Sequence, residues 1–305
     1  MKPSVPDARL HHFVPQFYLR RFGDSAGKLW VWDRDKDRTF KAKSKSVAAA
    51  NNFYRFDRLA TVGHDPLTME KQLSHLEGEV AKITAQWLSW LRQAQPMDKI
   101  PIPEINRELV ASYIAIQFLR AADARRLLSF FDRAVSDKPM TEEEIEDAHI
   151  QLLWDEDFVS CFSKRIQIST WMFGRNATRL PFITSDNPVA FRTGDNRIWL
   201  RTAVLSSGTY VVFPLAPDIV MYCYPIEEPF VSLSVLDSCL SPVTFTEDMV
   251  DSENCGQVFM ASRFIFSRDG NFEMAREFAR TIGTDTYAQG DTLEAELRRT
   301  LGLDA

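Results

Sequence analysis

Apolar residues recur at three- and four-residue steps in the middle of the chain, which is typical of helices with one buried face. The clearest pattern runs from about residue 69 to 93. It carries the apolar positions Leu73, Leu76, Val80, Ile83, Trp87 and Leu91. Prolines at 96, 101 and 103 end it, and a second pattern follows over 104–135. A third helix is predicted from the capping-box sequence at Thr141 to about residue 173, with a break near 154–157.

Short apolar runs separated by turn residues precede and follow this helical section. Lys28–Asp33 and 38–41 flank a charged turn and predict a β-hairpin. The later strand candidates are 180–184, 189–192, 197–201, 209–214, 219–224 and 263–267. A late helix is predicted near 246–261. We therefore predict an α+β fold with an N-terminal motif and β-hairpin, a central long-helix section, and a C-terminal, mainly antiparallel β section with a late helix.

The length of the chain is compatible with one large domain. A protein of 305 residues buries roughly three quarters of its extended surface, so a sizeable core is expected. We predict a single domain over 1–305. Its parts are a β-rich N-terminal region (1–66), a helical region (67–174), a second β-rich region (175–270) and a helical tail (271–305).

Charge and apolar content limit the partners and the location of the protein. The net charge is -6 and the pI is near 5.5, which argues against a broad nucleic-acid-binding surface, because such surfaces need many Lys and Arg. A local site for nucleic acid or a phosphorylated ligand is still compatible with this net charge. No run of about 18 apolar residues and no signal-peptide core is present, so we expect a cytoplasmic protein without a membrane partner. The 4 cysteines form no Cys-x-x-Cys pair and are expected to be reduced and structural.

The most unusual segment is HHFVPQFYLRRF, which runs from His11 to Phe22. Pro15 predicts an extended approach followed by a short helix that Gly23 ends. His11 and His12 then point in opposite directions, so they do not easily chelate one metal together. One of them could be a metal ligand or a proton-transfer group. The alternative is a pair of ordinary surface or core histidines.

Two polar side chains of the short helix share one face. Gln16 and Arg20 are four residues apart, which is about one helical turn. We expect this face to look toward Gln117 and Arg120 of the second long helix, and toward Asp186.

A second polar group is predicted between the first two long helices. Gln117 falls within the apolar face of the second helix, Arg120 lies one turn further along, and Glu77 is similarly placed on the first helix. A buried amide and a buried guanidinium must be paired. Two alternatives stay open: a network that ties the two helices together, or a set of ligand contacts.

Polar residues also follow a predicted strand at Ser185-Asp186-Asn187. Strand ends commonly present polar side chains to a cleft, so Asp186 is a candidate metal ligand or base, with Asn187 as a hydrogen-bonding partner. Ser, Asp and Asn are equally typical of Asx-turns, and a purely structural turn is the alternative.

These segments together resemble a bacterial family of unknown function that opens with HHxVPQFYLRxF. The resemblance rests on that motif, on Gln117-Phe118-Leu119-Arg120 and on TSDNPV at 184–189, and it covers about residues 10–268. The family has no assigned activity. The resemblance implies that its polar residues converge at one site, namely His11, His12, Gln16, Glu77, Gln117, Arg120, Asp186 and Asn187.

Two functions compete. The first is a metal-dependent hydrolase or nuclease in which one histidine, His11 or His12, and Asp186 hold a divalent cation or activate water, while Arg20 or Arg120 neutralises a phosphate. The second is a non-catalytic ligand-binding or sensor module. Its binding candidates are Gln16, Arg20, Glu77, Gln117, Arg120, Ser185 and Asn187. The kind of family suggests a role in bacterial defence or stress, including phage defence.

One geometric criterion separates the two functions. Shared metal coordination or proton transfer requires a histidine of the motif and Asp186 to lie within about 5 Å of each other. The histidine pair also resembles the first element of HNH nucleases, but Asn51, Asn52 and His64 do not follow in the arrangement that this fold requires.

Overall fold

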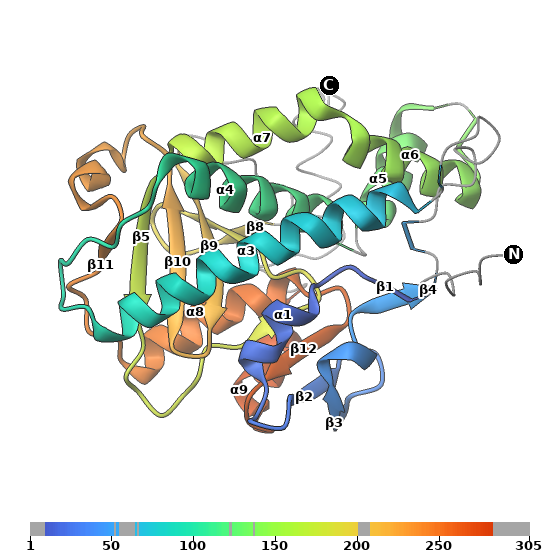
Figure 1. The fold of residues 1–305 in the computed structure, drawn as a ribbon. Coiled ribbons are helices and arrows are strands. Elements are labelled where there is room, and N and C mark those ends of the chain that lie inside the picture. The colour runs from blue at the N-terminus through green and yellow to red at the C-terminus, as the bar shows by residue number, and fades with distance from the viewer. Residues whose placement is uncertain are drawn as a thin grey trace, which may run out of the picture.

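A computed structural model describes residues 10–51, 53–54, 65, 67–121, 124–136, 138–200 and 208–282. His64, Asn52 and the helical tail predicted beyond residue 282 lie outside the described residues. The fold is α+β, as the sequence predicts (Figure 1).

A six-stranded sheet forms the centre of the molecule, in the order β11-β5-β10-β9-β7-β8. Its strands are β5 (Thr170–Arg175), β7 (Ala190–Thr193), β8 (Trp199–Leu200), β9 (Thr209–Ala216), β10 (Ile219–Tyr224) and β11 (Cys239–Leu240). Every pairing is antiparallel except the one between β11 and β5. This confirms the mainly antiparallel character predicted for the C-terminal β section.

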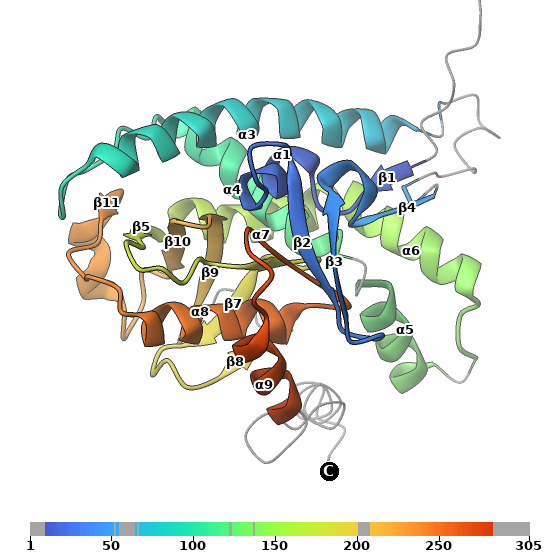
Figure 2. The same ribbon diagram turned by 90° about the horizontal axis from the view of Figure 1, so that it is seen from below.

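Helices cover both faces of this sheet (Figures 1 and 2). On one side lie α3 (Thr68–Gln93), α4 (Glu104–Leu119) and α7 (Glu156–Ile168), and on the other lies α8 (Glu247–Met260). Side chains along β9 therefore alternate between two cores: Val211 packs in the core beneath α3 and α4, whereas Val212 packs in the core beneath α8. Because both faces are covered, the strand is apolar at nearly every position.

A four-stranded sheet, in the order β3-β2-β12-β6, draws on both ends of the chain. The predicted hairpin is confirmed as β2 (Lys28–Asp33) and β3 (Arg38–Lys43), and its third strand is β12 (Phe264–Ser267). The fourth strand is β6 (Thr184–Ser185). The N-terminal hairpin thus completes its sheet only with C-terminal residues.

The N-terminal motif has the predicted local structure. β1 (Leu10–His12) pairs with β4 (Ala49–Asn51), and Pro15 precedes α1 (Gln16–Leu19). A 3-10 turn over Arg20–Phe22 continues the helix. The register of β1 with β4 could not be predicted, because neither strand has an alternating pattern of its own.

Two predicted helices were wrong in their extent. The helix predicted over 104–135 is two helices, α4 and α5 (Ala124–Val135), because the backbone leaves helical geometry at Arg120, with φ -88° and ψ 1°. Ala121 and Ala124 continue the apolar spacing across this break and conceal it from the sequence pattern.

The segment predicted as helix over 141–173 is α6 (Glu142–Trp154) followed by α7, which ends at Ile168. Residues 170–173 belong to the central strand β5 instead. A short run that is mostly apolar does not distinguish a buried strand from a buried helix. The strand predicted over 180–184 is limited to β6, whereas α9 (Glu273–Thr281) lies in the predicted helical tail.

Candidate functional site

The buried histidine of the motif is held by backbone. His11 is fully buried, its Nδ1 accepts a hydrogen bond of 2.9 Å from the Tyr54 amide, and its ring stacks on Tyr54 with centroids 6.1 Å apart. Because Nδ1 accepts, it carries no proton in this arrangement. His11 therefore connects β1 to the segment after β4.

The neighbouring histidine points the other way and is half-buried, as the alternation along a strand predicts. His12 Nε2 lies 3.2 Å from the Lys45 carbonyl, which can only accept, so Nε2 donates and Nδ1 is the basic nitrogen. Burial lowers the pKa of His12, while the bond to Lys45 and the charge of Glu77 oppose that shift. The imidazole is therefore neutral near pH 7.

The second predicted group is a connected network. The Gln117 carbonyl oxygen accepts from Arg120 Nε at 3.1 Å and Nη2 at 2.7 Å, and its amide donates to the Phe13 carbonyl at 2.9 Å. Arg120 Nη1 donates to Glu77 at 2.7 Å. Burial disfavours the charged form of Arg120, but the negative charge of Glu77 and the nearby Tyr54 outweigh this effect. The pKa of Arg120 is therefore raised. The network joins α3, α4 and the N-terminal motif, which confirms the predicted pairing.

Glu70 was not among the residues expected from the sequence, although it lies two turns before Glu77 on the same side of α3. Burial raises the pKa of Glu70 to about 7, and the negative charge of Glu77 adds to that shift. The seven-residue spacing between the two glutamates was a usable signal, because residues seven apart share one face of a helix.

The SDNP segment organises the connection between α8 and β12. Asp186 is 1% exposed, and its carboxylate accepts backbone N–H bonds from Ser262 at 2.8 Å, Arg263 at 2.8 Å and Phe264 at 2.9 Å. Ser185 Oγ donates to the Asn187 carbonyl at 2.8 Å and accepts from its amide at 3.1 Å. These contacts are those of a structural turn and a backbone anchor.

The two sequence motifs meet at a pair of hydroxyl groups. Tyr18 Oη donates to the Pro214 carbonyl at 2.7 Å and lies 2.8 Å from Thr184 Oγ1. Since the Tyr18 proton is directed at Pro214, Thr184 donates to the tyrosine oxygen. The N-terminal motif and the TSDNPV segment therefore contact each other through two buried hydroxyl groups.

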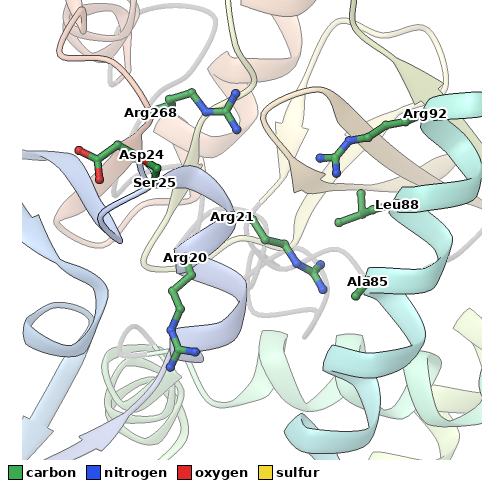
Figure 3. Close-up of a pocket in the computed structure, with 9 residues that line it drawn as sticks. Arg20, Arg21, Asp24, Ser25, Ala85, Leu88, Arg92 and Arg268 are labelled. Atoms are coloured by element: carbon green, nitrogen blue, oxygen red, sulfur yellow. The ribbon is translucent and has the colours of Figure 1, made fainter.

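Arg20 and Gln16 do share one face, with Arg20 Nη2 3.4 Å from Gln16 Oε1. Arg20 lines a surface pocket of about 420 Å³. The pocket is lined by Arg20, Arg21, Gly23, Asp24, Ser25, Ala85, Leu88, Arg92 and Arg268 (Figure 3). Neither Glu77, Gln117 nor Asp186 is part of this lining.

Four arginines reach the pocket from three segments: the turn after α1, the last turns of α3, and the residue after β12. Arg92 and Arg268 extend toward each other across it, and Arg21 is directed toward Ala85 (Figure 3). The Arg20 side chain is directed away from the other three (Figure 3).

Arg21 is the half-buried member of this group. It donates to Thr84 Oγ1 and, at 3.3 Å, to the Leu215 carbonyl. Thr84 in turn donates to the Val80 carbonyl at 2.6 Å, so its hydroxyl is oriented to accept from Arg21. Burial lowers the pKa of Arg21, and the nearby positive charge of Arg92 also acts to lower it.

Two carboxylates belong to the surroundings of the pocket, and both are bonded. Asp218 accepts from Arg92 Nε at 2.6 Å and from Nη2 at 2.8 Å. Burial disfavours the ionised form of Asp218, but the hydrogen bonds and positive charge of Arg92 outweigh this effect. The positive charge of Arg268 acts in the same direction, so the pKa of Asp218 is lowered. Asp24 is bonded to Lys41 at 2.7 Å, which together with backbone N–H bonds lowers its pKa to about 2. Arg92 is thus bonded to the ionised Asp218, and Arg268 lies close enough to help lower the pKa of that carboxylate.

Sequence analysis identified Arg20 and missed the other three arginines. Arg92 and Arg268 are far from the motif in sequence, and each was an ordinary charged residue in its own segment. Only the doubled arginine at 20 and 21 gave a local signal.

Two features are absent from the described residues. No three His, Cys, Asp or Glu side chains among them are grouped as metal ligands. No helix in the same part of the chain is long and apolar enough to cross a membrane.

The fold and the pocket define an α+β protein whose main sheet is covered by helices on both faces and whose surface carries an arginine-lined pocket. The chain belongs to the family described as "Protein of unknown function (DUF4238)", whose model matches residues 10–271. This confirms the family resemblance drawn from the motifs. No curated protein and no solved structure matches the chain.

Proposed function

We propose that this protein is a ligand-binding module that holds an anion among Arg21, Arg92 and Arg268. The observation that carries the proposal is the environment of Arg21. Its guanidinium is half-buried, and its hydrogen bonds go to a hydroxyl and a carbonyl, which are neutral acceptors. Burial of a charge is costly unless an opposite charge compensates it. A bound anion supplies that charge.

The chemistry of the lining supports an oxyanion. Guanidinium groups present a planar fork of N–H donors that matches phosphate and carboxylate oxygens. A volume of about 420 Å³ is in the range of small-molecule sites. The exposed Ala85 and an edge of Leu88 add apolar surface beside the arginines.

This proposal favours the binding-module alternative over the hydrolase. Under it, His11, Asp186 and the Gln117–Arg120 pair maintain the fold around the N-terminal motif. The motif then contributes to binding through Arg21, which lies in the 3-10 turn after α1.

Isothermal titration calorimetry of the purified chain with sodium sulfate, at constant ionic strength set with chloride, tests the proposal. We expect saturable binding of sulfate, weakened at least about tenfold in Arg21→Gln and in Arg268→Gln, since each loses a charge-assisted contact. Arg133→Gln, an exposed arginine of α5 outside the pocket, is the matched control and should bind like the wild type. Absence of saturable binding, or equal weakening in the control, would overturn the proposal.

A further inference from the structure

We infer that the anion is the dianionic end of a phosphate monoester and not the phosphodiester backbone of a nucleic acid. This inference rests on the proposed function and names the ligand class of the same pocket. Two observations carry it: the charge balance of the pocket and the number of converging guanidinium groups.

The charge balance favours a dianion. Arg21, Arg92 and Arg268 supply three positive charges to the pocket. Asp218, which holds Arg92 and whose lowered pKa keeps it ionised, supplies one negative charge, so two positive charges remain uncompensated. Asp24 does not change this balance, because Lys41 neutralises it. A phosphate monoester carries close to two negative charges above its second pKa of about 6, whereas a phosphodiester carries one.

The number of arginines fits the number of free oxygens. A monoester phosphate has three non-bridging oxygens, one for each of Arg21, Arg92 and Arg268, and a diester has two. A monoester carries one organic group, which can extend from the phosphate over Ala85 and Leu88. A diester carries two organic groups, which extend from the phosphate in different directions.

Asp218 holds one of these arginines in place. It accepts two hydrogen bonds of 2.6 and 2.8 Å from Arg92 and so orients that guanidinium. Its negative charge repels a dianion more strongly than a monoanion at the same distance, but the three positive charges of the arginines exceed it, so the dianion is still favoured. Asp218 is therefore a positioning residue that reduces the preference for a dianion without reversing it.

The charge of the whole chain agrees with this ligand class. Extended nucleic-acid surfaces depend on many basic residues that release counterions. This chain has 36 Lys and Arg against 42 Asp and Glu, which argues against an extended basic surface and is compatible with a local site for a small anion.

Calorimetry with methyl phosphate and dimethyl phosphate tests the inference, with sulfate as the reference dianion. At pH 8 we expect methyl phosphate to bind at least about tenfold more tightly than dimethyl phosphate, since it makes an additional charge-assisted contact. At pH 5 methyl phosphate loses its second charge, and its affinity should fall toward that of dimethyl phosphate. Sulfate stays dianionic at both values, and a constant sulfate affinity shows that the protein itself has not changed.

Equal affinity for the two phosphates would overturn the inference. Sulfate binding in the same experiment would still support the proposed anion site. Failure of all three anions to bind would overturn the proposed function as well. Asp218→Asn provides a second readout: removal of its negative charge should raise the affinity of methyl phosphate more than that of dimethyl phosphate. An unchanged or smaller affinity ratio in a folded Asp218→Asn variant, checked by its unfolding transition, would overturn the charge-balance argument.

Discussion

The hydroxyl groups of Tyr18 and Thr184 lie 2.8 Å apart and join the N-terminal motif to the TSDNPV segment. Tyr18 also donates to the Pro214 carbonyl of β9, so a single buried side chain links α1 to both sheets. The adjacent Leu215 carbonyl accepts from Arg21. The contact that holds the motif against the sheets is therefore next to the contact that holds Arg21 at the pocket.

We expect Tyr18→Phe to lower the free energy of unfolding by about 1–3 kcal/mol, because a buried carbonyl and a buried hydroxyl lose their partner. Urea denaturation measures this loss. Tyr113→Phe is the matched control, since the Tyr113 hydroxyl is buried without a hydrogen-bond partner. That variant should be as stable as the wild type or slightly more so, and an equal loss in both variants would contradict the assignment.

Asp186→Asn should destabilise the fold by on the order of 3 kcal/mol, because charge-assisted bonds to three backbone amides are weakened together. Asp157→Asn, at an exposed position in the first turn of α7, is the control and should change stability by only a few tenths of a kcal/mol. Sulfate titration of the remaining folded protein provides the functional readout. Loss of binding in a stable Asp186→Asn variant would contradict a structural role.

The Glu77–Arg120 pair is buried on the arginine side, with side chains 22% and 1% exposed respectively. Glu77→Gln leaves the buried guanidinium without its counter-charge, and we expect a loss of about 3 kcal/mol. Arg120→Met should cost a similar amount, because Gln117 also loses its partner. The double variant should lose clearly less than the two single variants combined, as a double-mutant cycle in urea would measure. Additive losses would show that the pair is not coupled.

Glu70 gives a prediction for pH dependence. Its pKa in the folded protein is raised to about 7 from the ordinary value of 4.5, so between these values the folded state binds more protons than the unfolded state. Stability from this group is therefore present below pH 4.5 and is lost as the pH rises through 7. Glu70→Gln should consequently be more stable than the wild type at pH 8 and no more stable at pH 4.

Thermal unfolding at the two pH values measures this difference. Glu79→Gln on the same helix is the control, because the hydrogen bond from Lys82 lowers the pKa of Glu79. Its removal should leave stability at pH 8 unchanged or slightly reduced. A gain at pH 8 in both variants would point to the net charge of the helix instead of to Glu70.

Local patterns along the chain were sufficient for most elements. The 69–93 periodicity gave α3 to within one residue, and the hairpin and strands β9 and β10 followed from short apolar runs. The pattern failed at β5, a mostly apolar segment in which Trp171 and Phe173 are fully buried and pack against Trp87 of α3. Strand and helix then leave the same trace in the sequence.

The sequence by itself determined most of the helices and strands, the extended approach of His11 and His12, and the need for Gln117 and Arg120 to find partners. Each of these depends on residues close together in the chain or on the cost of burying a polar group. Tertiary structure decided that Asp186 anchors backbone and that Arg21, Arg92 and Arg268 share one pocket. Their proximity depends on how a 3-10 turn, a long helix and a C-terminal strand pack together, and long-range packing leaves no periodic signal in the sequence.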